Sequence, residues 1–172
     1  MEPPKRPIEP RRAHGRSPRL VLMCGLPGAG KTTLARRLEA ELPAVRLCPD
    51  EWLAALGIDL RDEITRDRLE TQFWLLARRL LALGQSVILE SGFWLRSDRD
   101  EKRLGARALG AAVELRFLGA PLDELYHRIE RRNAAPAPGD AHITRADLEL
   151  WATVFQAPDA AELALFDPPE RP

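Results

Sequence analysis

The chain has 172 residues, which is enough for one domain with a sizeable core. Its 26 Lys and Arg residues equal its 26 Asp and Glu residues, so the net charge gives no support for a surface that binds a polyanion. The 2 cysteines stand in apolar runs, which argues against a disulfide framework and for a reducing compartment. No apolar run reaches the ~18 residues of a membrane span. We therefore expect a cytoplasmic protein that does not cross a membrane.

The N-terminal segment 1–18 is rich in proline, lysine and arginine. It cannot bury enough apolar surface to become ordered, and it lacks the apolar stretch of a secretory signal. We expect a disordered tail. A weak basic contact segment is the alternative, although charge runs are usually only solvated.

The next segment carries the most informative motif, a phosphate-binding loop of pattern G-x-x-x-x-G-K-[ST]. It consists of Gly25, Leu26, Pro27, Gly28, Ala29, Gly30, Lys31 and Thr32, and Thr33 follows. The glycines allow backbone N–H groups to surround phosphates, Lys31 can reach the β- and γ-phosphates, and the Thr32 hydroxyl can bind Mg²⁺. An apolar run at 19–24 precedes the loop and a helical pattern follows it, which aims a helix N-terminus at the phosphates. We expect this loop to bind ATP; a glycine-rich turn without a ligand is the alternative.

The rest of the chain alternates strand and helix patterns. Strands are expected at 45–48, 86–90 and 112–118, and helices at 51–56, 65–83, from 97 onward, at 121–133 and at 144–156. Two capping boxes are expected, from Ser97 to Asp100 and from Thr144 to Asp147. The alternation predicts an α/β fold, a parallel sheet of four or five strands flanked by helices, with a small helical lid. The domain is expected to span 19–166, with a frayed tail at 167–172.

One carboxylate stands where catalysis would need it. In a parallel sheet, ligands bind beyond the carboxyl ends of the strands. Asp50 follows the second expected strand, across from the phosphate loop, where it can accept the proton of an acceptor hydroxyl. Asp50 could equally be the N-cap of the helix at 51–56. Glu51 is the second choice for the base.

The end of the third expected strand offers a metal ligand and aromatic side chains. Glu90 stands where many phosphate-loop proteins place a carboxylate that holds Mg²⁺, and pairing with an arginine is the alternative. Phe93 and Trp94 follow it, and together with Trp52 they are candidates for the walls of an acceptor pocket. Packing in the core is the alternative for these three aromatic residues.

A later helix carries candidate phosphate ligands. Arg128 and Arg132 are i and i+4 neighbours on one face of the helix expected at 121–133. Arginine binds phosphate oxygens bidentately, and a mobile segment that carries it can close over ATP. The alternative is a solvated basic face that pairs with Glu130 and nearby acids.

These motifs together resemble a known family. They are Gly25 to Thr33, Asp50, Glu90-Ser91-Gly92-Phe93-Trp94 and Arg128-x-x-x-Arg132-Asn133. Over about residues 19–166 the chain resembles small P-loop kinases that are often labelled AAA-family ATPases and are related to zeta toxin, chloramphenicol phosphotransferase and polynucleotide kinase. The resemblance implies that Lys31 and Thr32 handle the phosphates and Mg²⁺, and that Asp50 is the catalytic base. It also places Arg128 and Arg132 in a lid.

The expected activity is phosphoryl transfer. We expect an ATP- and Mg²⁺-dependent kinase that transfers the γ-phosphate to a hydroxyl of a small-molecule acceptor, with Lys31, Asp50, Arg128 and Arg132 as catalytic residues. One alternative is a kinase of polynucleotide 5′-hydroxyls, which the neutral net charge disfavours. Another is a regulatory nucleotide-binding NTPase without an acceptor; a guanine-reading Asn-Lys-x-Asp motif is absent. We expect a monomer or a homodimer.

Overall fold

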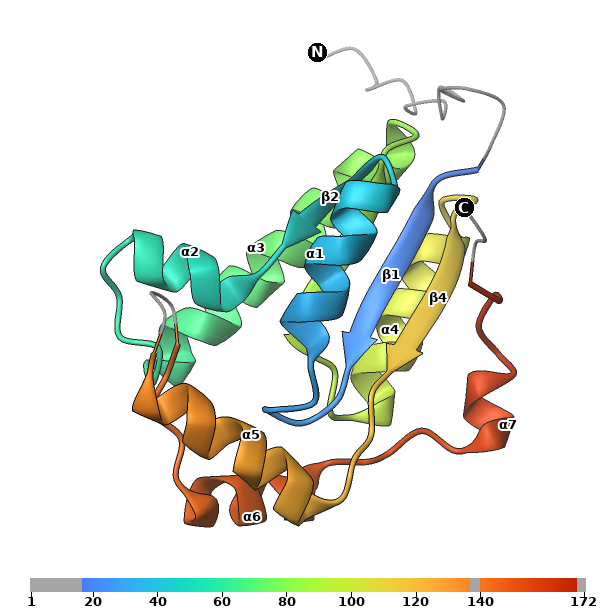
Figure 1. Ribbon diagram of the computed structural model, residues 1–172. Coiled ribbons are helices and arrows are strands. Elements are labelled where there is room, and N and C mark those ends of the chain that lie inside the picture. Colours follow the sequence, from blue (N-terminus) through green and yellow to red (C-terminus); the bar gives the residue numbers. More distant parts are fainter. Residues whose placement is uncertain (1–16, 137–139, 170–172) are drawn as a thin grey trace.

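The structure, a computed structural model, describes residues 17–136 and 140–169. Its centre is a parallel sheet of four strands: β1 (Arg19–Cys24), β2 (Ala44–Leu47), β3 (Ser86–Gly92) and β4 (Ala112–Phe117). Their spatial order is β2-β3-β1-β4, so the first strand lies inside the sheet (Figure 1). Leu22 of β1 is in register with Leu89 of β3 and with Leu115 of β4. The predicted α/β class is confirmed, with four strands in the described part of the chain.

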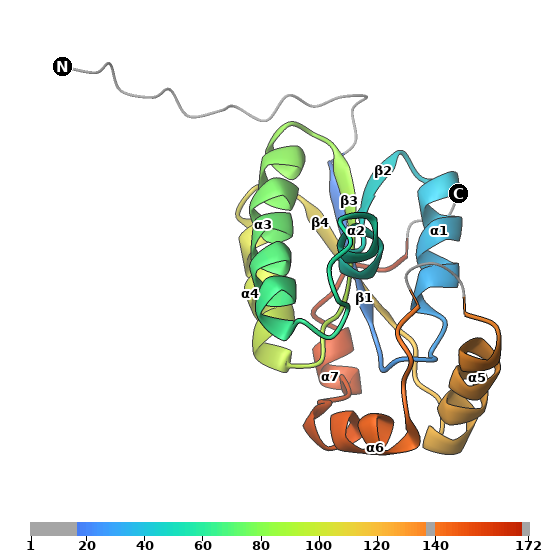
Figure 2. The ribbon, with the colours of Figure 1, turned by 90° about the vertical axis from the view of Figure 1, so that its left-hand side faces the viewer.

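Seven helices of the described residues surround the sheet. They are α1 (Lys31–Glu41), α2 (Pro49–Ala55), α3 (Glu63–Ala82), α4 (Arg96–Arg107), α5 (Leu122–Ala134), α6 (Arg145–Val154) and α7 (Ala160–Leu163). Figure 2 shows α3 and α4 on one face of the sheet and α1 on the other. Helices α5 and α6 lie beyond the ends to which the strand arrows point (Figure 1). None of the described helices has the length and apolar character that crossing a bilayer requires.

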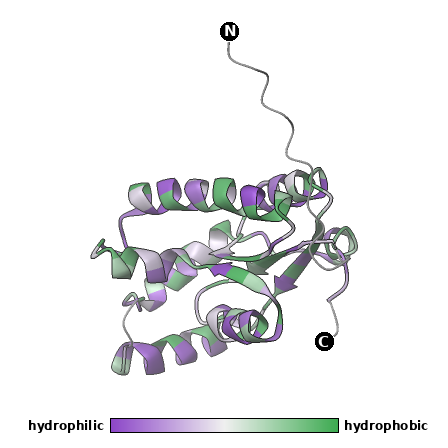
Figure 3. Cartoon of the chain, turned by 90° about the horizontal axis from the view of Figure 1, so that it is seen from above, coloured by the Kyte–Doolittle hydropathy of each residue, from purple (hydrophilic) through white to green (hydrophobic). Residues whose placement is uncertain are grey.

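The alternation of side chains along β1 explains the two layers. Leu20 and Leu22 point to one face of the sheet and pack with residues of α3 such as Phe73. Val21 and Met23 point to the opposite face and pack against α1. All are buried, because a parallel sheet covered on both faces needs apolar residues at every position. Each covering helix carries both hydrophobic and hydrophilic residues (Figure 3).

A third cluster joins the carboxyl end of the sheet to α5 and α6. Leu26 and Ala29 of the phosphate loop pack with Leu125 and Ile129 of α5, and Leu148 of α6 belongs to the same cluster. The helix with the candidate phosphate-binding arginines is therefore held directly against the phosphate loop.

The two predicted capping boxes had different outcomes. The one from Thr144 to Asp147 is confirmed at the start of α6, with both reciprocal bonds present. The one at Ser97 is wrong, because α4 begins at Arg96 and has no side-chain cap. The side-chain oxygen of Gln156 instead accepts the Arg96 N–H at 2.9 Å. A contact distant in sequence replaces the local cap.

The C-terminal segment remains attached to the sheet beyond residue 166. Asp167 donates its N–H to the Val113 carbonyl at 2.8 Å and accepts the Val113 N–H on its carboxylate at 2.7 Å. The frayed tail was predicted to begin at Asp167, but this residue is hydrogen-bonded to the outer edge of β4. The expected disordered tail lies, up to residue 16, outside the described residues, as do residues 170–172.

Candidate active site

The phosphate loop depends on glycine at two positions of close approach. At Gly25, with φ of 150°, a Cβ atom would lie 2.5 Å from the Leu118 carbonyl oxygen. At Gly28, with φ of 81°, it would lie 2.7 Å from the Leu125 carbonyl oxygen. Only glycine adopts these conformations without strain and leaves room for the neighbouring backbone. The loop then enters α1, whose first residue is Lys31.

Lys31 occupies an environment that disfavours its positive charge. Its Nζ donates to the Leu26 carbonyl oxygen at 2.9 Å. Burial lowers the pKa of Lys31 to about 8, and the Arg132 cation acts in the same direction, whereas Glu90 and Asp50 oppose the shift. An anion placed beside Lys31 would relieve this penalty, as expected for a lysine that binds phosphate.

Thr32 and Glu90 lie together at the start of α1 and the end of β3. The Thr32 hydroxyl donates to the Glu90 carboxylate, whose other oxygen accepts from Arg46 at 2.8 Å. Glu90 is therefore paired with an arginine, which was the alternative, and it also contacts the threonine of the phosphate loop; its role as a Mg²⁺ ligand stays a prediction. A hydroxyl and a carboxylate are oxygen ligands of the kind that Mg²⁺ prefers. No group of three or more His, Cys, Asp or Glu residues within the described ranges is arranged to hold a metal ion, and in phosphoryl transfer water and phosphate supply the remaining ligands.

Asp50 lies in the first turn of α2 but does not cap it. The helix begins with Pro49 after Cys48, which provides no side-chain cap. The Asp50 carboxylate instead accepts a hydrogen bond from Arg66 of α3 at 2.5 Å. The helix-cap alternative is therefore wrong, and the carboxylate faces a large cleft.

Glu51 is committed to other contacts. Its carboxylate accepts from Arg36 at 2.8 Å and from Arg46 at 2.6 Å. Burial alone would raise the pKa of Glu51, but these hydrogen bonds bring it below its usual value. Glu51 also does not line the cleft that Asp50 faces. It is the weaker candidate for the base.

The two candidate arginines of α5, Arg128 and Arg132, both lie near the phosphate loop. Arg128 donates to the Gly28 carbonyl at 3.3 Å and also pairs with Glu124 on its own helix. Arg132 influences the pKa of Lys31, and its Nε is buried without a hydrogen-bond partner among the described residues. The Asp140 carboxylate is 3.8 Å from that atom. Both arginines therefore lie near the phosphate loop, and each also pairs with a carboxylate; their role in binding phosphate stays a prediction.

A cleft of about 1010 Å³ joins Lys31 and Asp50 to the residues after β3. Phe93 and Trp94 line it, as expected, and α3, α4 and α6 form its other walls. The Trp94 indole N–H donates to the Gly25 carbonyl at 3.4 Å, and its ring centroid lies 5.8 Å from that of Trp151. The cleft thus connects the phosphate loop to an aromatic wall.

The prediction that Trp52 forms a wall of the same cleft is wrong. Trp52 does not line the cleft; it lines a separate depression of about 240 Å³ on α2 and α3, with its ring 5.0 Å from that of Phe73. Residues two apart on a helix point about 200° from each other, so Trp52 and Asp50 cannot face the same space.

Carboxylates outnumber cationic groups in the cleft. The acidic residues that line it are Asp50, Glu63, Asp67, Glu70, Glu90, Asp98, Glu101 and Asp147, and the Lys and Arg residues are Lys31, Arg61, Arg66 and Lys102. Burial raises the pKa of Glu70 to about 7; Arg66 opposes the shift, and the charges of Asp67, Asp50 and Asp98 add to it. The lining of the cleft therefore carries an excess of carboxylates.

Sequence reasoning did not identify the arginines that hold these carboxylates. Arg46 joins Glu39, Glu51 and Glu90, and Arg66 holds Asp50. Arg46 and Glu90 are separated by 44 residues, so no local pattern could have revealed the pairing. A third such residue, Arg99, is considered below.

A parallel sheet with a phosphate loop after its first strand, and an arginine-bearing helix against that loop, is the architecture of the P-loop kinases. Residues 20–158 match the family model AAA_33, described as an AAA domain, and the chain belongs to this family. No curated protein matches the chain in sequence.

Solved structures with the same fold include several kinases. A candidate kinase from Chloroflexus aurantiacus is 28% identical with a TM-score of 0.65, and the match covers 84% of this chain and 83% of that chain. The APS kinase of Mycobacterium tuberculosis, solved with AMPPNP and APS, is 23% identical with a TM-score of 0.58, covering 83% and 84%. A chain of the Pnkp1/Rnl/Hen1 RNA repair complex is 23% identical with a TM-score of 0.66, covering 81% of this chain but only 44% of that one. This chain therefore spans less than half the length of the RNA repair chain that it matches.

Proposed function

We propose that this chain is an ATP- and Mg²⁺-dependent kinase that transfers the γ-phosphate to a hydroxyl group of a small molecule. The observation that carries the proposal is a single cleft lined by both Lys31 of the phosphate loop and the Asp50 carboxylate. A phosphate donor and a group able to accept a hydroxyl proton would therefore face the same space.

The phosphate loop would bind the nucleotide. Backbone N–H groups of residues 25–33 would surround the β- and γ-phosphates, and Lys31 would exchange its bond to Leu26 for phosphate oxygens. Thr32 and Glu90 would hold Mg²⁺, which supplies positive charge against the phosphates. The α5 arginines would stabilise the transferring phosphoryl group, since they already approach the loop.

Asp50 would act on the acceptor. It would take the hydroxyl proton as the acceptor oxygen bonds to the γ-phosphorus, while the bond from that phosphorus to the bridging oxygen breaks and ADP leaves. Arg66 occupies part of the Asp50 carboxylate. A carboxylate has about four acceptor positions, so Arg66 and an acceptor hydroxyl can bind it together. Arg66 would then keep the Asp50 carboxylate oriented towards the acceptor.

The charge of the cleft supports a small acceptor. A polynucleotide needs several Lys and Arg side chains along the path of its phosphates. The walls away from the phosphate loop instead carry an excess of carboxylates, and the aromatic side chains of Phe93 and Trp94 also line the cleft. These walls suit a neutral or cationic molecule that has one apolar face and a reactive hydroxyl.

The experiment that tests this proposal is a transfer screen. The protein is incubated with Mg²⁺ and ATP labelled at the γ-phosphate, together with pools of neutral and cationic hydroxyl compounds or with 5′-hydroxyl oligonucleotides. Products are separated and identified by mass spectrometry, and Lys31→Met serves as the inactive control. A phosphorylated small molecule supports the proposal. Labelled oligonucleotide ends would establish the polynucleotide alternative, and ATP hydrolysis with no labelled product from either pool would favour a regulatory NTPase.

A further inference from the structure

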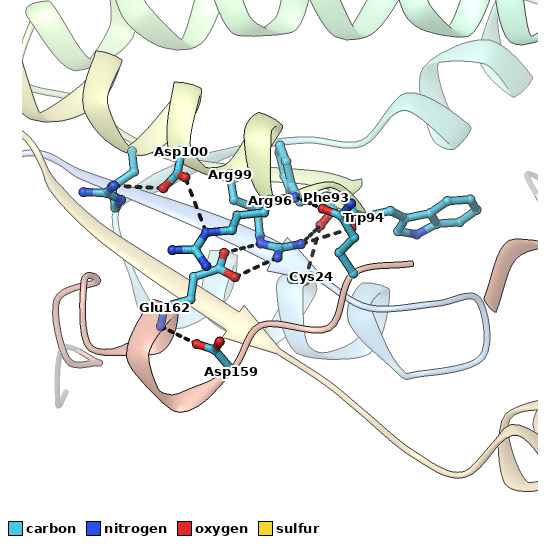
Figure 4. Close-up of polar contacts among 10 residues, drawn as sticks. Cys24, Phe93, Trp94, Arg96, Arg99, Asp100, Asp159 and Glu162 are labelled. Carbon is cyan, nitrogen blue, oxygen red and sulfur yellow. Dashed lines mark hydrogen bonds and ion pairs between the residues drawn. The ribbon is translucent and has the colours of Figure 1, made fainter. Parts of the chain in front are cut away.

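Arg99 of α4 is a buried charge that the proposed transfer does not use. Its side chain has no exposed surface, and that of its partner, Glu162 of α7, is 2% exposed. The two form a bidentate pair, with distances of 2.6 Å from Nε to Oε1 and 2.9 Å from the terminal nitrogen to Oε2 (Figure 4). The Asp159 carboxylate accepts the Glu162 N–H at 2.7 Å and so caps α7, the helix that supplies Glu162.

The remaining terminal nitrogen of Arg99 faces the wall of the cleft. It donates to the carbonyl oxygens of Phe93, at 2.9 Å, and Trp94, at 3.2 Å (Figure 4). Phe93 has a φ of 45°, and it is the only non-glycine residue with positive φ in the described part of the chain. A bulky residue in this region is strained, so the surrounding contacts have to hold it there.

Two further bonds tie the same turn to its surroundings. The Cys24 thiol donates to the Phe93 carbonyl at 3.4 Å, and the Gln156 N–H donates to the Trp94 carbonyl at 3.0 Å. The Trp94 indole N–H reaches the Gly25 carbonyl, so this turn also contacts the phosphate loop. Gln156 connects the turn to the segment after α6, and Arg99 connects it to α7.

A purely stabilising role does not explain this arrangement well. A buried ion pair is weak evidence for stability, because well-packed apolar residues of similar volume often serve as well. Apolar residues cannot, however, donate hydrogen bonds to two carbonyls of a strained turn. The guanidinium does so while Glu162 neutralises its charge.

We propose that Arg99 is a positioning residue that fixes the turn of Phe93 and Trp94 and thereby sets the aromatic wall of the acceptor cleft. Glu162 orients Arg99, so the shape of the wall depends on the docking of α7. The assignment of this wall to an acceptor rests on the proposed function. The link from Arg99 to the conformation of the turn does not depend on it.

The test compares two double variants, each of which replaces an arginine of α4 together with its acidic partner and leaves the net charge unchanged. Arg99→Met with Glu162→Met removes the pair but keeps apolar volume. Arg103→Met with Asp100→Ala removes the Arg103–Asp100 ion pair of α4 and the longer pair of Asp100 with Arg96, but leaves the bonds of Arg99 to the turn in place. Amide hydrogen exchange is measured in both at residue 99, whose N–H donates to the Leu95 carbonyl, and at Gln156, whose N–H donates to the Trp94 carbonyl. The NMR signal of the Trp94 indole N–H and the ATP affinity by calorimetry are measured on the same samples.

In the Arg99/Glu162 variant we expect exchange at these two amides, which donate to carbonyls of the turn, to rise about tenfold or more, the Trp94 indole signal to shift, and the sheet amides to keep their protection. ATP affinity should change less than about twofold, and the Arg103/Asp100 variant should match the wild type at the turn. A folded Arg99/Glu162 variant with wild-type exchange at the turn would overturn the proposal. If that variant does not fold, Arg99→Lys is measured instead, since it keeps the charge but not the planar set of donors, and unchanged exchange there has the same meaning. Failure of the transfer screen would not affect these readouts, so the two proposals can fail separately.

Discussion

Asp50 accepts a hydrogen bond from Arg66 at 2.5 Å and so connects the first turn of α2 to α3 across the mouth of the cleft. This contact bears on the two roles that the sequence left open for Asp50, the catalytic base and the N-cap of a helix. A capping aspartate would bond to the backbone of its own helix, whereas this one is held by an arginine from another helix. Its second oxygen can serve an acceptor hydroxyl.

Replacement of Asp50 by Asn should lower phosphoryl transfer by roughly 10²–10⁴-fold with ATP affinity unchanged, because the amide keeps the shape but cannot take the proton. The melting temperature should change little, since Asp50 is half-exposed and such ion pairs contribute little to stability. Initial rates, calorimetry and thermal melts on the same samples check this. Asp67→Asn, in the same cleft but off the proposed proton path, is the matched control. Full activity in Asp50→Asn would remove Asp50 from the mechanism.

Lys31→Met should abolish ATP binding and stabilise the ligand-free protein. The pKa of Lys31 is about 8 in the folded chain against 10.5 ordinarily, so the unfolded chain binds more protons between these values. The charge of Lys31 therefore destabilises the folded chain fully below pH 8, and this penalty disappears as the pH rises from 8 to 10.5. Thermal melts should therefore show a gain of roughly 2–4 °C at pH 7 that shrinks towards pH 10. A loss of stability at pH 7 would contradict the assigned environment of Lys31.

Glu70→Gln should stabilise the protein at pH 8 and leave it unchanged near pH 4. Burial raises the pKa of Glu70 to about 7 from 4.5, so stability falls as the pH rises from 4.5 to 7 and the full penalty is present above 7. The expected gain at pH 8 is roughly 2–4 °C in melting temperature. Glu63→Gln, on the exposed first turn of the same helix, is the control and should have no such pH dependence. Equal effects of both substitutions at every pH would show that burial does not control Glu70.

Arg132→Ala should reduce turnover by about tenfold or more while changing the melting temperature little, because the ion pair that it loses, with Asp140, is long at 3.8 Å and partly exposed. Arg131→Ala provides the comparison, since that neighbour is exposed. Turnover and melting temperature are measured for both variants. If the two variants keep equal activity, the α5 arginines form only a solvated face.

The sequence was most informative where the chemistry is local. The phosphate loop is specified by consecutive residues whose conformations require glycine, and apolar periodicity was sufficient to predict the strands and the larger helices. It was misleading where a distant contact replaced a local one. Gln156 took the place of the expected cap at Ser97, and helical geometry turned Trp52 away from Asp50.

The part of the site that could not be predicted consists of long-range ion pairs. Arg99 and Glu162 are separated by 63 residues, and Arg66 and Asp50 by 16 residues and an intervening loop. An arginine in a helical pattern gives the same signal whether it is solvated or buried in such a pair. Only the packing of α4 against the C-terminal segment reveals that Arg99 has no exposed surface.

The most direct test of the central claim is the formation of a phosphomonoester followed by ³¹P NMR. Wild-type protein, ATP and Mg²⁺ are mixed with a neutral or cationic hydroxyl compound identified by the transfer screen. The account predicts a new phosphomonoester signal that grows in step with ADP, and that falls by roughly 10²–10⁴-fold with Asp50→Asn while ATP binding is retained. Release of ADP and inorganic phosphate alone, at the same rate in the wild type and in Asp50→Asn, would contradict it.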